Sequence, residues 1–284
     1  RGVKQIVHSN FVRYTERDGL TSLMVNAIFS SHLGELFVIT KQNIESKDKK
    51  ALRALHVLNR FDGNRFVAVM PKVPSTAGPG WGSMQVVVED RAGQWWLPSD
   101  KKAVFRFPQV GRLEQLSTTK PQAIAIPDGE VFRLYEDVRG DIWIGTMYAG
   151  RVLKWERRTQ LLRDYTAELP KPSDEPNPQL HLTCFAEDRQ GTLWAGFYNH
   201  GYLMRYRDAH FTLLPTHGEK SDDAINSLYF DHAGRLWLTS RQNGVGRIDD
   251  PYAESLKIGW YNRRKGLATD AVTGLTEDNF GRIY

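Results

Sequence analysis

Five aspartates hold the same place in a repeated phrase of this chain, and their carboxylates could in principle act as acids, bases or cation ligands. Each lies three residues before a glycine, and an aromatic residue follows three residues after that glycine. A glycine at this spacing suits the left-handed last position of a hairpin turn, and an aspartate at the first position can accept backbone N–H bonds. We therefore interpret five residues as turn formers and not as catalytic acids: Asp90, Asp137, Asp188, Asp231 and Asp278.

The aromatic residue of the phrase could offer a stacking surface to a sugar ring. It falls in the middle of a predicted strand, at an equivalent position in every copy, so we expect it to fill the space between neighbouring repeats instead. In chain order the residues are Phe37, Trp96, Trp143, Trp194, Trp237 and Tyr284.

Other patterns that carry catalysis are missing from the sequence. There is no Gly-x-Ser-x-Gly elbow and no glycine-rich phosphate loop, and the eight histidines show no metal-type spacing. Cys184 is the single cysteine and lies in an apolar strand, which favours a buried, unreactive role. Asp222 and Asp223 form a carboxylate pair in a loop, for which backbone capping is the plainer role and a cation site the alternative. The sequence predicts no catalytic residue, no metal site and no cofactor.

The phrase occurs six times, which indicates a repeat architecture. Its glycines are 59, 47, 51, 43 and 47 residues apart, a period typical of stacked or circular repeats. Residues 131–146 read as a strand, a four-residue turn and a return strand, and shorter strands follow at 151–155 and 161–165. Four strands per repeat predict an all-β fold, a β-propeller of four-stranded antiparallel blades. First and second strands are predicted at 83–90, 94–98, 131–136, 141–146, 182–187, 192–197, 225–230 and 235–239.

The two ends of the chain read as parts of one blade. Residues 1–7 and 11–14 resemble third and fourth strands, and the chain stops at Tyr284 inside a second strand. We count about six blade-equivalents, five complete and one split between the ends. Residues 1–284 are therefore expected to form a single propeller region that starts and ends inside a blade, as a fragment of a larger protein with a seven-bladed or double propeller as the longer form.

The phrase resembles the two-component-regulator propeller repeat, which is found in sensor regions of bacterial hybrid histidine kinases and related receptors. The similarity is close at 134–146 (LYEDVRGDIWIGT) and 185–196 (FAEDRQGTLWAG). The first two copies depart from the family phrase, with Phe37 in place of Trp and Pro98 in place of Gly. The resemblance implies a periplasmic sensor region of a receptor that dimerises to signal, with ligands that are often carbohydrates.

Composition and charge narrow the range of partners. The chain is 40% hydrophobic and 25% charged, as in ordinary globular domains, and no apolar run is long enough to cross a membrane. No signal peptide is visible, although a chain that starts inside a blade would not show one. The net charge of +5 could attract a polyanion, but the basic residues are scattered outside 47–50 and 157–158. We expect no nucleic-acid partner, and we interpret 47–50 as a solvated loop insertion.

Loops on one side of the blades are the expected recognition surface. Connections from second to third strands, and from one blade to the next, emerge on the same side and vary between copies. We place two second-to-third connections at 41–43 and 100–101 and expect Asp223 in a blade-to-blade loop. The residues expected to contact a ligand are Trp81, Tyr148, His181, Tyr198, Asn199, His200, Arg241 and Asn243.

Three functions remain open at this point. The first is a non-catalytic sensory or interaction module of a receptor. The second is a propeller lyase or hydrolase acting on saccharides or cyclic peptides, which would require His, Arg and carboxylate side chains converging on the central channel. The third is a structural scaffold for protein contacts.

Overall fold

The computed structural model describes residues 3–7, 10–31, 33–45, 52–69, 87–98, 102–147, 149–171, 180–198, 201–216 and 223–284. The chain divides into two compact units, residues 1–134 and 135–284, with the boundary inside one strand. Regular structure in the described ranges is β-strand apart from four short 3-10 turns, which confirms the all-β prediction.

The first unit holds two four-stranded antiparallel blades and one two-stranded sheet, with strands paired in chain order. The two-stranded sheet is β1 (Val3–Val7) and β2 (Asn10–Tyr14). The first blade is β3 (Val25–Ser30), β4 (Leu36–Glu45), β5 (Leu52–Phe61) and β6 (Phe66–Val69). The second is β7 (Val88–Glu89), β8 (Trp95–Pro98), β9 (Ala103–Phe107) and β10 (Gln122–Ala125).

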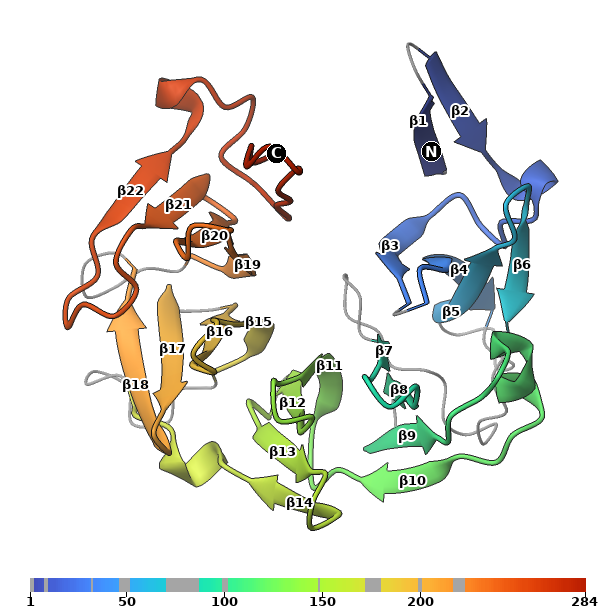
Figure 1. Ribbon diagram of the computed structural model, residues 1–284, viewed down its shortest axis with the longest axis horizontal. Helices are drawn as coiled ribbons and strands as arrows, with labels where there is room; N and C mark the ends of the chain where they lie inside the picture. Colours follow the sequence, from blue (N-terminus) through green and yellow to red (C-terminus); the bar gives the residue numbers. More distant parts are fainter. Residues whose placement is uncertain are drawn as a thin grey trace. The chain divides into compact units, whose positions relative to one another are not determined.

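The second unit holds the other blades, again with strands in chain order (Figure 1). The third blade begins in β11 (Glu130–Glu136), which crosses the unit boundary, and continues with β12 (Ile142–Met147), β13 (Val152–Glu156) and β14 (Leu161–Asp164). The fourth is β15 (Leu182–Glu187), β16 (Leu193–Phe197), β17 (Tyr202–Arg207) and β18 (His210–Pro215). The fifth is β19 (Ile225–Phe230), β20 (Leu236–Ser240), β21 (Val245–Ile248) and β22 (Ile258–Tyr261).

The described residues therefore form five blades, and the expected count of about six was wrong. The last copy of the phrase makes only a short hairpin, with the bridge Glu277↔Ile283 and paired backbone bonds between Thr276 and Tyr284. The overcount has a local cause. The turn closes through its own hydrogen bonds, as at Asp278, whether or not a four-stranded sheet follows it.

The turn aspartates have the predicted structural role. Asp137 Oδ1 accepts the N–H of Arg139 at 3.0 Å and of Asp141 at 2.9 Å, and Gly140 has φ +80°. In the first copy the hydroxyl of Ser31 accepts the two equivalent N–H groups. The same carboxylate pattern recurs at Asp90, Asp188, Asp231 and Asp278.

The prediction that the repeated aromatic residues pack between blades is confirmed at Trp143 and Trp194, but it was wrong for Tyr284, which is 64% exposed. Trp143 of β12 is buried and meets Tyr206 of β17 with ring centroids 5.1 Å apart. Trp194 of β16 lies in one apolar cluster with Ile225 of β19. Gly196, two residues after Trp194, allows this approach, because a Cβ there would lie 2.7 Å from the Ile225 side chain.

Some connections differ from the prediction. Residues 41–43 belong to the ladder of β4, which pairs with β5 as far as Glu45↔Leu52, so they are not a loop. Residues 46–51, which include the predicted insertion, and residues 99–101 lie outside the described residues. The positions of β9 and β10 were not predicted, although four strands per blade were, because the repeated phrase covers only the first and second strands.

Candidate functional site

The structure brings part of the predicted ligand-contacting set together. Trp81, Tyr148, Asn199 and His200 lie outside the described residues. The other predicted residues, His181, Tyr198, Arg241 and Asn243, all lie in the second unit. They stand at the end of the blades where second-to-third strand connections emerge, which we call the loop side. The opposite end, with the Asp-x-x-Gly turns, is the turn side.

Tyr198 and Arg241 form a direct pair across two blades. Tyr198 follows β16 and Arg241 follows β20. The Arg241 guanidinium donates to the Tyr198 hydroxyl at 2.8 Å and lies 4.9 Å from the centre of its ring. The backbone of Tyr198 donates to the carbonyl of His181 at 2.8 Å, so Tyr198 contacts His181 through its backbone and Arg241 through its side chain. Tyr198 remains 37% exposed, which makes the pair a partly open aromatic and cationic surface.

Asn243 faces inward and supports this loop. Its side-chain amide donates to Asp223 at 2.6 Å, and Asp223 is only 1% exposed. The same carboxylate accepts the hydroxyl of Ser240 and the N–H groups of Gln242 and Ala224. Asp223 thus fixes the turn that carries Arg241, which agrees with a backbone-capping role.

A cation site at the Asp222–Asp223 pair receives no support from the geometry. The Asp223 carboxylate is occupied by donors, and Asp222 is outside the described residues. Within the described part of the chain, no group of three or more His, Cys, Asp or Glu side chains is arranged to hold a metal ion.

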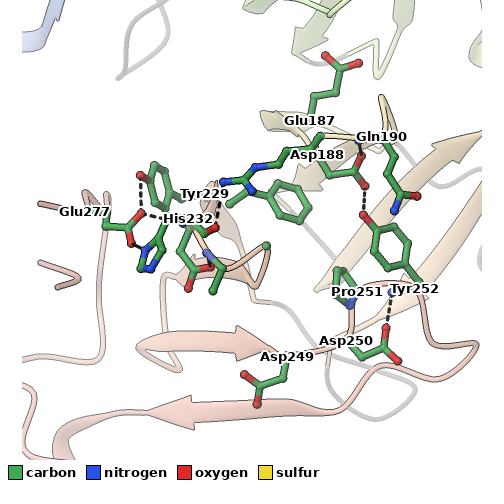
Figure 2. A pocket seen from close by; sticks show the side chains of 15 residues that line it. Glu187, Asp188, Gln190, Tyr229, His232, Asp249, Asp250, Pro251, Tyr252 and Glu277 are labelled. Atoms are coloured by element: carbon green, nitrogen blue, oxygen red, sulfur yellow. Dashed lines mark hydrogen bonds and ion pairs between the residues drawn. The ribbon is translucent and has the colours of Figure 1, made fainter. Parts of the chain in front are cut away.

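A cavity of about 630 Å³ opens on the turn side, between the fourth and fifth blades (Figure 2). It is lined by residues 187–190 and 229–234 of the two turn regions, by residues 249–252 of the β21–β22 connection, and by Glu277. The sequence prediction assigned this side to structure alone. A signal was present, since Phe230 stands directly before its turn aspartate where Glu89, Glu136, Glu187 and Glu277 stand in other copies.

The replacement of glutamate by Phe230 removes a contact between blades. Glu187 accepts the N–H of Val138 in the preceding turn at 2.7 Å, and Glu277 accepts the N–H of His232 at 3.0 Å in the same way. Phe230 has no carboxylate and instead packs edge-on to Trp194, with ring centroids 6.4 Å apart. The boundary between the fourth and fifth blades is therefore built differently from its two neighbours.

Glu277 also bonds to the His232 ring and accepts the Tyr229 hydroxyl at 3.2 Å (Figure 2). The hydrogen bond from His232 lowers the pKa of Glu277 below its ordinary value, and the His232 and Tyr229 bonds together outweigh the opposing effect of burial. This end of the cavity is thus held by an ionised carboxylate with its donors already in place.

The fourth turn also departs from the repeat in its tryptophan contact. Trp96, Trp143 and Trp237 each donate the indole N–H to the aspartate of their own turn at 2.8–2.9 Å. At Asp188 the donor is the Tyr252 hydroxyl, at 2.8 Å (Figure 2). The buried Trp194 Nε1 has no hydrogen-bond acceptor among the described residues. Burial, and then the bond to Asp188, raises the pKa of Tyr252 to about 12.

Comparison with known proteins supports the fold. Residues 125–148 match the family model described as two component regulator propeller. No curated protein matches the chain. The extracellular domain of BT4673 from B. thetaiotaomicron, described as a one component system, is similar with a TM-score of 0.68 and 14% identity. That match covers 99% of this chain and 34% of the other.

Two further structures are similar. Another structure of the BT4673 extracellular domain, described there as a hybrid two component system, has a TM-score of 0.63 and 18% identity over 95% of this chain and 33% of that one. Virginiamycin B lyase from Staphylococcus aureus has a TM-score of 0.55 and 17% identity over 87% of this chain and 66% of the enzyme.

The chain thus spans about one third of the BT4673 domain structures, and identities this low establish the fold alone. Among the described residues, no helix has the length and apolar character needed to cross a membrane. The described residues therefore form a β-propeller of four-stranded blades, in which one stretch, residues 125–148, matches the two component regulator propeller model.

Proposed function

We propose that this propeller is the non-catalytic sensory module of a bacterial signal-transduction receptor and lies outside the cytoplasmic membrane, in the periplasm. The matched repeat supports this proposal, as does the likeness to a domain described as extracellular and as part of a two component system. In the receptor the module acts as a homodimer, so that ligand binding or association changes the signal.

The observation that carries the proposal is the Tyr198–Arg241 pair on the loop side. The two side chains come from different blades, contact each other and remain partly open. An aromatic face and a fork of N–H donors suit a ligand with an apolar ring face and hydroxyl groups. A carbohydrate has this chemistry, and we take it as the ligand class.

The test is calorimetric titration of the chain with a panel of oligosaccharides. We expect the double variant Tyr198→Ala/Arg241→Ala to lose binding while keeping the thermal midpoint of the parent. Arg158→Ala, an exposed arginine in the β13–β14 turn, is the matched control and should bind normally. Saturable binding that survives the double variant would place recognition elsewhere.

The alternative is a propeller enzyme, a lyase or hydrolase acting on saccharides or cyclic peptides. The observation in its favour is the fold shared with virginiamycin B lyase. Incubation of the chain with virginiamycin B, followed by mass spectrometry, separates the two functions. Turnover of the compound would replace the sensory proposal, whereas unchanged compound supports it.

A further inference from the structure

We propose that the turn-side cavity between the fourth and fifth blades is a second binding site, for a small organic cation, and that its occupant displaces Tyr252 from Asp188. The site is separate from the loop-side pair, and the proposal does not depend on whether that pair binds a carbohydrate.

The charge of the cavity opposes that of the chain. Its described lining holds six carboxylates and one guanidinium, Arg189, while Arg235 and Arg247 pair with Asp231 and Asp249 from just outside the lining, which gives six minus three, or a net charge of −3 with His232 neutral. The whole chain carries +5. A hollow lined by one sign of charge concentrates the opposite sign. The six carboxylates are Glu187, Asp188, Asp231, Asp249, Asp250 and Glu277.

The apolar part of the lining is aromatic. Tyr229, Phe230 and Tyr252 border the cavity, and the faces of aromatic rings attract ammonium and guanidinium groups. A volume of about 630 Å³ lies in the range of small-molecule sites. The lining therefore fits a cation attached to a short apolar body better than a metal ion.

The neighbouring turn shows what a cation does at such an aspartate. Asp231 Oδ2 accepts two donors at once, the guanidinium of Arg235 at 2.6 Å and the indole of Trp237 at 2.8 Å. The residue equivalent to Arg235 in the fourth turn is Thr192, which supplies no charge. Tyr252 occupies Asp188 Oδ2 instead. A ligand cation at Asp188 would restore the arrangement seen at Asp231.

A second argument, independent of the charge of the cavity, comes from Trp194. It indicates that the fourth turn has another state, in which Tyr252 does not bond to Asp188. A buried donor without an acceptor is unfavourable, and the equivalent indole reaches its aspartate in three other copies. Once the Tyr252 hydroxyl leaves Asp188, the Trp194 indole can take its place beside the ligand cation. Ligand binding and the Trp194 hydrogen bond then favour the same state.

The segment that carries Tyr252 is built to line this cavity. The third-to-fourth strand connection runs over 249–257 in the fifth blade but only over 208–209 in the fourth. Arg205 anchors it by donating to the carbonyls of Pro251 at 3.2 Å and Ala253 at 3.4 Å. The same guanidinium lies 5.7 Å from the Trp194 ring, so the segment and the unsatisfied indole share a support.

The experiment uses the full chain and agmatine, which carries a guanidinium and an ammonium, with 1,5-pentanediol as the neutral probe. The indole N–H signal of Trp194 is assigned in a proton–nitrogen correlation spectrum by its loss in Trp194→Phe. We expect agmatine to shift this signal saturably and slow its exchange with water. The Trp96 and Trp143 indoles should not respond, and 1,5-pentanediol should have no effect.

Two variants test the roles assigned to the side chains. Tyr252→Phe removes the competing hydroxyl and should tighten agmatine binding by about three-fold or more, with Tyr202→Phe as the matched control. Asp250→Asn, at an exposed position, should weaken binding by a similar factor. Equal response to both probes, no saturable shift at millimolar agmatine, or unchanged affinity in Tyr252→Phe would each overturn the proposal.

Discussion

At the scale of single residues, each turn aspartate performs two tasks with its two oxygens. Oδ1 of Asp137 accepts backbone N–H groups, while Oδ2 accepts the indole of Trp143 at 2.9 Å. The first copy has neither group needed for the second contact, since the Ser31 side chain has only one oxygen and the Phe37 side chain has no N–H. This pairing explains why the serine is tolerated there. Asp137, whose two oxygens are filled by the backbone of its own turn and by a buried indole, is therefore a structural group.

The turn glycines should be sensitive to any side chain. Gly140 and Gly234 both have φ +80°, where a Cβ is strained, and a Cβ at Gly140 would also lie 2.9 Å from Arg157 Nε. We expect Gly140→Val to lower the free energy of unfolding by about 1–3 kcal/mol and Gly234→Ala by about 1–2 kcal/mol. Urea denaturation measures both. Gly274→Ala, with open space and no positive φ, is the control, and an unchanged midpoint for Gly140→Val would contradict the turn assignment.

Acid should weaken the fifth turn. Burial tends to raise the pKa of Asp231, but hydrogen bonds from Trp237 and Arg235 lower it below the ordinary value of 3.8. A carboxyl with a lowered folded pKa contributes stability above its unfolded pKa and loses it as pH falls through the folded one. We therefore expect unfolding free energy, measured by urea titration, to drop as pH falls below about 4. Asp231→Asn should show a smaller drop, and an equal drop would refute the assignment.

At the scale of the strand and the blade, the sequence was most informative where the turn sets the register. The strands predicted at 182–187 and 225–230 coincide with β15 and β19, since an Asp-x-x-Gly turn fixes where each hairpin begins. Outside the repeated phrase, no such turn indicates where a strand begins or ends. The ladder of β4 continues through 41–43, and β10 forms without any periodic mark, because long-range pairing decides both.

Gly196, which follows the repeated aromatic residue Trp194 by two positions, should matter for packing between blades. A Cβ on Gly196 would lie 2.7 Å from Ile225 and 2.8 Å from the Cys184 sulfur. Overpacking of this kind predicts a loss of about 1–3 kcal/mol in unfolding free energy for Gly196→Ala. Gly259→Ala is the matched control in β22, where the nearest atom is 3.8 Å away. Equal midpoints for the two variants in chemical denaturation would rule out close blade packing at Gly196.

At the scale of the whole molecule, the sequence predicted one of two candidate surfaces. Loop residues that escape the repeat indicated Tyr198 and Arg241, and the structure joins these two. The turn-side cavity could not be predicted from the phrase, because it depends on Tyr252 reaching Asp188 from 64 positions along the chain. That contact forms only in the folded chain. In the repeated phrase, the one feature that distinguishes this boundary is Phe230 in place of a glutamate.

The last prediction decides which side of the propeller transmits a signal. Substituting Tyr198, His200 and Arg241 together by Ala should leave the fold intact, because connections on the loop side contribute little to the apolar core. In the full receptor the triple variant should weaken ligand-dependent signalling, measured with a reporter of its output. Receptor carrying Tyr252→Phe serves as the comparison on the turn side.

If the triple variant signals normally and the turn-side variant does not, recognition lies at the turns. If neither variant alters the output, the propeller acts as a dimerising scaffold. In that case the reporter should respond only to those substitutions that light scattering shows to change the association state of the propeller.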